Sequence, residues 1–200
     1  MTADSGKVPL SRFLVFGLLV IVGVAWDLWT KDTVFADLGV QGRADWEWRC
    51  GDFVRFCLQT NLNFGALWGI GQGWTGLFAA LSMVAVIGVL YFLFGMKHAQ
   101  SWWLTISLGF VLAGALGNLY DRLGMHGIVD ANGAQVYAVR DFLYFRFFET
   151  FDWAIFNFAD SYLVTGAIML VIHSFQAEPE TVVNTNAVPA LNPAAPTDAV

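Results

Sequence analysis

Four stretches of the chain are long and apolar enough to cross a membrane as helices. They cover residues 13–29, 74–94, 99–120 and 153–177. A helix that spans the hydrocarbon core of a bilayer needs roughly 20 residues at about 1.5 Å of rise per residue. The carboxylates of Asp27 and Asp160 are the only ones in the first and last stretches. The pattern therefore predicts an all-α membrane protein with four transmembrane helices.

Two long loops and one short loop connect these stretches. The first long loop, about residues 30–72, is rich in Trp, Phe and Gly. The second, about residues 121–152, contains the turn signal Asp130-Ala-Asn-Gly133, and the segment from Gln135 to Arg140 after it resembles a short strand. We expect residues 1–177 to form one domain. Residues 178–200 hold four prolines and no aromatic residue, which predicts a disordered tail.

Composition supports the membrane interpretation. Hydrophobic residues make up 57% of the chain and charged residues only 13%, whereas soluble domains carry about 25% charged residues. The net charge is −6 and there is no run of Lys or Arg, so the sequence does not indicate a nucleic-acid partner. Cys50 and Cys57 lack the spacing of a zinc site. They are either a disulfide, if their loop faces an oxidising compartment, or two free thiols.

Charge alone leaves the orientation in the membrane open. Four spans place both termini on one side and both long loops on the other. Lys7 and Arg12 precede the first span and favour an internal N-terminus, but most basic residues lie on the loop side.

Polar residues collect where the spans meet the two long loops. Given four alternating spans, all of them lie at the same membrane edge: Asp27, Lys31, Asn63, Asn118, Asp121, Arg122, Asn157 and Asp160. Asp27 and Lys31 are four residues apart and can pair on one helix face. Asn118 has the spacing to brace Asp121. For any one of these residues a helix cap or an interfacial side chain is the better interpretation, but the convergence of the whole set on one edge favours a site.

The side chains at this edge narrow the chemistry. The sequence offers no Gly-x-Ser-x-Gly elbow, no convincing Ser/His or Cys/His pair and no metal-ligand spacing. Two carboxyl groups that share one proton can instead activate a water molecule for attack on an amide. The alternatives are a small proton-coupled transporter, whose site would lie nearer the midplane, and a non-catalytic membrane subunit whose polar edge binds a partner.

Four motifs, in order along the chain, resemble those of the signal peptidase II family. They are Asp27-Leu-Trp-Thr-Lys31, Asn63-Phe-Gly-Ala66, Gly117-Asn-Leu-Tyr-Asp-Arg122 and Phe156-Asn-Phe-Ala-Asp160. The resemblance implies an aspartic endopeptidase with a catalytic Asp pair, no cofactor and no metal. It implies that Asp160 is one member of the pair. The residues that it implies to line or brace the site are Asp27, Lys31, Asn63, Gly65, Asn118, Asp121, Arg122 and Asn157.

The second catalytic carboxylate has two candidates. Asp130 follows the Asp121-Arg122 pair at the family's usual distance, but Val139-Arg-Asp-Phe-Leu143 matches the family's segment better and lies at the usual distance from Asp160. We predict Asp141, with residues 127–138 as an inserted hairpin and Asp130 as the alternative.

The resemblance also implies substrate and location. The substrates would be prolipoproteins that already carry a diacylglyceryl group, and the enzyme would be a monomer in contact with membrane lipid. It would be a multi-pass protein of the bacterial inner membrane, with both termini cytoplasmic and the site at the outer leaflet edge. The first long loop would form a small extracytoplasmic β-structure between the first two helices. Its aromatic residues Trp46, Trp48, Phe53 and Phe56 suit the membrane interface.

Overall fold

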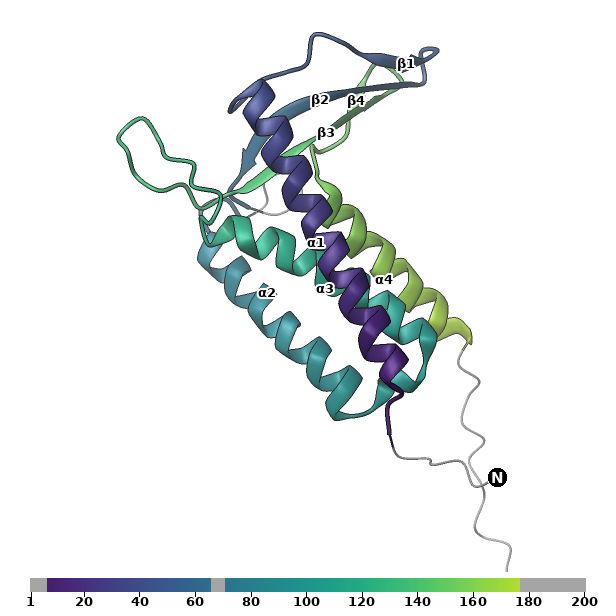
Figure 1. Cartoon of the computed structure of the whole chain (residues 1–200). Helices are drawn as coiled ribbons and strands as arrows, with labels where there is room; N and C mark the ends of the chain where they lie inside the picture. Colours follow the sequence, from purple (N-terminus) through teal and green to yellow (C-terminus); the bar gives the residue numbers. More distant parts are fainter. Residues whose placement is uncertain (1–6, 66–70, 177–200) are drawn as a thin grey trace, which may run out of the picture.

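Four helices of membrane-spanning length form the body of the protein in the computed structural model, which describes residues 7–65 and 71–176 (Figure 1). Their bounds are α1 Leu10–Leu38, α2 Thr75–Leu90, α3 Trp102–Arg122 and α4 Phe158–Gln176. A wider helical turn continues α2 over Tyr91–Gly95. The predicted number of helices long enough to span a membrane is confirmed within the described residues. The tail predicted over residues 178–200 lies outside the described residues.

Helix α1 is nine residues longer at its C-terminal end than its apolar stretch predicts. It continues to Leu38 because one face remains buried after the apolar run ends at Trp29, with Lys31 and Phe35 on that face. At about 1.5 Å per residue, a helix of 29 residues exceeds the hydrocarbon thickness of a bilayer. Its last turns therefore project toward the sheet, as Figure 1 shows.

Helix α3 lies between the other three helices and is the most buried of the four. Small residues allow its close approach to its neighbours. A Cβ atom on Gly114 would lie 2.3 Å from the carbonyl oxygen of Ala159, and one on Gly117 would lie 2.5 Å from Oδ2 of Asp27. Glycine at these two positions therefore lets the end of α3 pack against α1 and against the start of α4.

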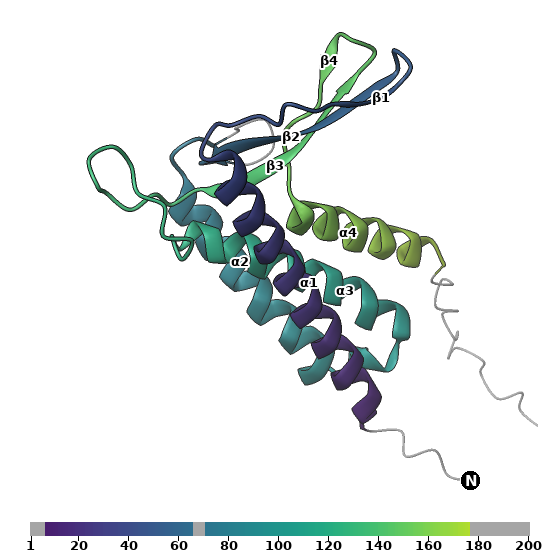
Figure 2. The same ribbon diagram turned by 45° about the horizontal axis from the view of Figure 1, so that its top comes forward.

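A four-stranded antiparallel sheet covers one end of the helices. Its strands are β1 Trp48–Cys50, β2 Val54–Asn63, β3 Val139–Phe147 and β4 Phe151–Asp152, in the order β1-β2-β3-β4. β1 and β2 come from the loop where the family resemblance implied β-structure, and the second long loop supplies the other half of the sheet. Figure 2 shows the sheet continuing away from the helix ends.

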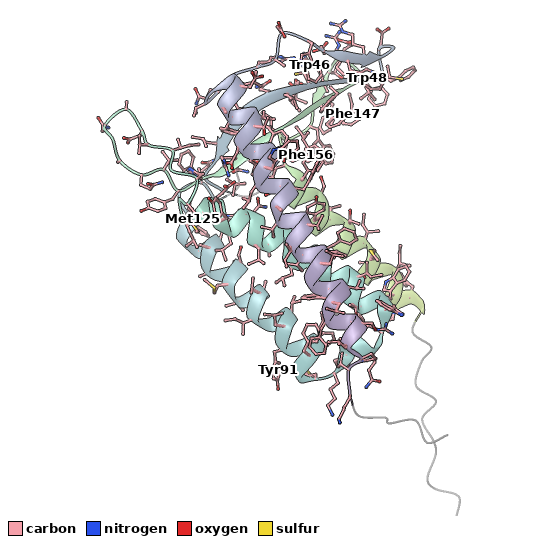
Figure 3. All side chains as sticks on the ribbon, viewed as in Figure 1. Trp46, Trp48, Tyr91, Met125, Phe147 and Phe156 are labelled. Carbon is pink, nitrogen blue, oxygen red and sulfur yellow. The ribbon has the colours of Figure 1, made fainter. Side chains whose placement is uncertain are left out.

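The sheet has one aromatic face and one charged face, because cross-strand partners point to the same side and successive residues to opposite sides. Trp48, Phe56 and Phe145 lie opposite one another on β1, β2 and β3. The neighbouring row is Arg49, Arg55 and Arg146. In Figure 3 Trp48 on β1, and Trp46 just before it, lie remote from the helices, while Phe147 and Phe156 lie nearer α4.

Residues 127–138 form a hairpin, as predicted, but the strand expected from Gln135 to Arg140 is displaced. Val129 and Gln135 pair across the hairpin, and β3 begins only at Val139. Asp130 is exposed, and its Oδ1 accepts hydrogen bonds from the backbone N–H groups of Asn132 (2.8 Å) and Ala134 (2.9 Å). These bonds lower the pKa of the Asp130 carboxyl. Asp130 therefore caps the turn of a hairpin that projects away from the sheet (Figure 1).

Both cysteines are free thiols in the structure, which favours the second of the two alternatives. Cys50 is exposed at the end of β1, whereas Cys57 is 1% exposed in β2. Burial raises the pKa of the Cys57 thiol, and a protonated thiol is a poor nucleophile.

We expect maleimide to label native, unreduced protein at Cys50 and to reach Cys57 only after denaturation. Cys50→Ser should remove the native signal. Absence of labelling in denatured, unreduced protein would show a disulfide instead.

Candidate active site

The predicted pair Asp141 and Asp160 comes together at the junction of the sheet and the helices. Asp141 is the third residue of β3, and Asp160 lies in the first turn of α4. Both carboxyl groups bind Asn157: its side-chain Nδ2 donates to Oδ1 of Asp141 (2.7 Å), and its backbone N–H donates to Oδ2 of Asp160 (3.3 Å). A single residue thus links the two carboxyl groups.

The start of α4 fixes Asp160 by a reciprocal cap. Oδ1 of Asn157 accepts a hydrogen bond from the backbone N–H of Asp160 (2.9 Å), while the carboxylate of Asp160 accepts the N–H of Asn157. This arrangement corresponds to a capping box, in which the first and fourth residues satisfy each other's free N–H groups. The same sequence that begins the helix therefore sets the position of the Asp160 carboxyl.

Asp141 is held on both oxygens and is almost fully buried, at 1% exposure. Oδ2 accepts a hydrogen bond from Nδ2 of Asn63 on β2 (3.0 Å), and Oδ1 accepts the bond from Asn157. Burial raises the pKa of the Asp141 carboxyl well above its ordinary value, and the negative charge of Asp160 raises it further. The surroundings of Asp141 therefore favour a protonated acid beside a more accessible carboxylate.

A buried polar layer supports the pair from α1 and α3. The predicted pairing of Asp27 and Lys31 is confirmed by a distance of 2.7 Å between Nζ and Oδ2. Nζ of Lys31 also lies 3.1 Å from Oδ2 of Asp121 and donates to Oδ1 of Asn118 (3.3 Å). The bracing of Asp121 by Asn118 is not observed, because Nδ2 of Asn118 donates instead to Oδ1 of Asp160 (2.8 Å). Lys31 thus reaches the pair through Asn118.

Asp27 also contributes to the cap of α4. Its Oδ1 accepts the backbone N–H of Ala159 (2.8 Å), one of the groups at a helix N-terminus that lack an intrahelical partner. Its other oxygen pairs with Lys31. Asp27 therefore joins α1 to α4 immediately before Asp160.

Arg122 and Gly65 lie at the remaining side of the site. A terminal nitrogen of Arg122 donates to the carbonyl oxygen of Gly65 (3.4 Å), and the backbone N–H of Gly65 donates to Oδ1 of Asn63 (3.0 Å). The guanidinium of Arg122 also stacks over Phe78 at 5.4 Å from the ring centroid. These contacts link α3 and α2 to the end of β2, which carries Asn63.

Sequence reasoning missed two charged residues that support the site. Arg140 is 2% exposed, and its Nε donates to Oδ1 of Asp121 (3.0 Å). A terminal nitrogen of Arg140 pairs with Asp32, which follows Lys31 on α1. Only their positions beside Asp141 and Lys31 could have singled them out, because Arg140 lies 108 residues from Asp32 and 19 residues from Asp121 in the chain.

An apolar pocket of about 510 Å³ opens beside Asp160. Its walls come from the aromatic face of the sheet, from the segment before α4 and from α4 itself. The lining residues are Phe145, Phe147, Trp153, Phe156, Asp160, Ser161, Val164 and Thr165. Trp153 and Phe156 could not be assigned to a pocket from the sequence, because they lie on the connection between β4 and α4.

The sequence of this chain matches the family model of signal peptidase (SPase) II over residues 19–176. The chain belongs to the signal peptidase II family. Lipoprotein signal peptidase of Rhodopirellula baltica is 40% identical over 175 residues, which cover 87% of this chain and 78% of that protein. Lipoprotein signal peptidase of Geobacillus thermodenitrificans is 30% identical over 166 residues, covering 82% of this chain and 91% of that protein. The predicted family is confirmed, and with it the peptidase class.

The fold is also similar to solved structures of bacterial membrane enzymes. One shares 26% sequence identity with a TM-score of 0.63, over 81% of this chain and 88% of that chain. Another shares 25% identity with a TM-score of 0.62, over 82% and 94%. Among the described residues, no cluster of three or more His, Cys, Asp or Glu side chains could hold a metal ion.

Proposed function

We propose that the protein is an aspartic endopeptidase that removes signal peptides from diacylglyceryl-modified prolipoproteins, with Asp141 and Asp160 as its catalytic pair. The observation that supports it most is the joining of both carboxyl groups by Asn157, with Asp160 also lining an apolar pocket. The names of the relatives agree with the substrate class.

The two carboxyl groups have different surroundings, which suits different roles. Asp141 is buried and its pKa is raised, so it holds the shared proton and polarises the scissile carbonyl. Asp160 is partly exposed and borders the pocket, so it acts as the base that takes a proton from the attacking water. The water oxygen then bonds to the carbonyl carbon, and the carbonyl oxygen takes the proton of Asp141. As the C–N bond breaks, Asp160 gives the proton that it took from water to the leaving nitrogen, and one hydroxyl group of the intermediate returns a proton to Asp141 as the new carbonyl forms.

The pocket supplies a reason for a lipid-modified substrate. Its aromatic walls present apolar surface next to Asp160, so an acyl chain can move from the lipid into the pocket without being exposed to water. An acyl chain or the apolar part of a signal peptide held there places the peptide bond before the modified cysteine at the carboxyl pair.

We further propose that the sheet and the carboxyl pair lie at the outer face of the inner membrane, with both termini cytoplasmic. Exposed Trp46, Trp48 and Phe53 then occupy the interfacial region, where aromatic side chains are enriched. Tyr91 lies at the other end of the helices (Figure 3). We propose that the chain acts as a monomer.

The decisive experiment uses the purified chain in detergent micelles with two synthetic precursors that differ only in diacylglyceryl modification of the cysteine. We expect cleavage of the modified precursor just before that cysteine and little or no cleavage of the unmodified one. A small transporter or a non-catalytic subunit would cleave neither. Equal cleavage of both would contradict the assignment of the substrate.

A bulky side chain in the pocket should weaken substrate binding more than it slows the chemical step. Val164 lines the pocket from α4 and is 58% exposed, so Val164→Trp adds bulk without disturbing the core. We expect KM for the lipidated precursor to rise about tenfold, equivalent to about 1.4 kcal/mol, with kcat changed less than about threefold. Val171→Trp on the same helix, 55% exposed and outside the pocket, is the matched control. An unchanged KM would show that the pocket does not hold the substrate.

A further inference from the structure

The buried guanidinium of Arg140 has no direct role in the proposed chemistry. Arg140 immediately precedes Asp141 in β3, and successive residues of a strand face opposite sides. Its side chain binds Asp121 and Asp32, while that of Asp141 faces Asn63 and Asn157. Arginine is rarely buried to this extent unless it is paired. The side-chain contacts of Arg140 therefore lie on the face of β3 opposite to the Asp141 carboxyl group.

Arg140 attaches β3 to α3 at two points on one carboxylate. Its backbone N–H donates to Oδ2 of Asp121 (3.0 Å), and its Nε donates to Oδ1 of the same residue (3.0 Å). One of these bonds comes from the main chain and the other from the side chain. Together they fix both the position and the orientation of β3 relative to α3 at this residue. The next residue along the strand is Asp141.

Arg140 also attaches β3 to α1. Its NH1 pairs with Asp32, whose side chain is 66% exposed. One planar guanidinium thus connects two helices to the strand, an arrangement that a lysine ammonium cannot reproduce. Asp32 has no described hydrogen bond to either carboxyl group of the pair, and its described ion pair at the site is with Arg140.

We propose that Arg140 is a positioning residue, which uses its ion pairs with Asp121 and Asp32 to set the approach of the Asp141 carboxyl to Asp160. This role rests on the proposed function, because it concerns the geometry of that pair. A misplacement of about 1 Å at a reacting group can cost about 100-fold in rate. We therefore expect substitution of Arg140 or Asp32 to lower kcat, although the proposed role places neither residue in contact with the substrate.

A change in the position of β3 should also alter the pH profile. The charged and polar groups that face Asp141 are Asp160 from α4, Asn63 from β2, Lys31 from α1, Arg122 from α3 and Asn157 before α4. If β3 relaxes, Asp141 gains water and moves away from the charge of Asp160. Both changes lower the pKa of Asp141. The pair then loses its shared proton at a lower pH. The fall of kcat on the alkaline side of its pH profile therefore begins at a lower pH.

The test compares wild type with Arg140→Lys and Asp32→Asn, in purified full-length protein with the diacylglyceryl-modified precursor. We expect kcat to fall about 10- to 100-fold in Arg140→Lys and about 3- to 10-fold in Asp32→Asn, with KM changed less than about twofold. In both variants the alkaline limb should move to lower pH. In the Arg140→Lys background, Asp32→Asn should have little further effect, because the two residues act through one contact. Asp37→Asn, also exposed on α1, is the matched control and should match wild type.

Three results would overturn this role. The first is a wild-type kcat and pH profile in both variants. The second is a fall in activity that follows only the fraction of folded protein, measured by thermal unfolding, because it would show a merely structural contribution. The third is a wild-type chain that does not cleave the lipidated precursor, which would overturn the proposed function and this role together. The surface position of Asp32 keeps the test meaningful even if Arg140→Lys does not fold.

Discussion

Asp141→Asn and Asp160→Asn should each abolish cleavage of a diacylglyceryl-modified precursor while the purified protein stays folded. A carboxamide fits the volume of each carboxyl group but can neither hold the shared proton nor accept one from water. General acid–base catalysis contributes about 100- to 10,000-fold, so we expect kcat to fall by at least about 100-fold in each variant. Product formation by mass spectrometry measures the loss, and the midpoint of thermal unfolding checks the fold.

Asp130→Asn is the matched control for both variants. Asp130 was the alternative for the second catalytic position, and in the structure it is exposed and caps the turn of the hairpin. Its amide variant should retain much of the wild-type kcat, because an asparagine oxygen can accept the same backbone N–H bonds. An inactive Asp130→Asn beside an active Asp141→Asn would overturn our choice of residue while leaving the peptidase class unchanged.

Lys31→Met should cause the largest loss of stability. The side chain of Lys31 is fully buried, and its Nζ lies 2.7 Å from Asp27 and 3.1 Å from Asp121. Removing the ammonium leaves two buried carboxylates without their shared cation. Breaking a buried ion pair in this way typically costs about 3–5 kcal/mol in the free energy of unfolding. We expect a lower midpoint of thermal unfolding and reduced yield of folded protein in detergent.

Two further variants test the cause of this loss. Lys7→Met removes an exposed lysine ahead of α1 and should leave the unfolding midpoint unchanged.

Asp27→Asn should lower both stability and activity, because Asp27 pairs with Lys31 and caps α4 beside Asp160. Combined with Lys31→Met, it should destabilise less than the sum of the two single variants, because it removes one of the orphaned charges. Additive losses would show that the two residues stabilise the protein independently. Loss of turnover in Asp27→Asn with the midpoint unchanged would give Asp27 a more direct role in the chemistry.

The hydrophobic pattern by itself determined the number of spans and the edge at which the polar residues meet. A membrane span requires a long apolar stretch, so four such stretches leave little freedom in topology. Alternation of the spans then places Asp27, Asn118 and Asp160 at one end without any knowledge of packing. The order of four short motifs identified the family, since each motif keeps its residues at fixed local spacing.

Only the tertiary structure decided which partner each polar side chain takes. Asn118 lies three residues before Asp121 on α3, yet it donates to Asp160 on α4, because Arg140 and Lys31 already occupy the carboxylate of Asp121. Helical spacing shows which side chains share a face, but it carries no information on what other elements bring to that face.

The extent of α1 and the composition of the sheet were likewise beyond the sequence. The apolar run of α1 ends at Trp29, but burial of Lys31 and Phe35 against the rest of the protein continues the helix to Leu38. The pairing of β2 with β3 joins segments about eighty residues apart, and no local pattern encodes such a register. That pairing places Asn63 beside Asp141, so the packing of distant strands, rather than any motif, completes the site.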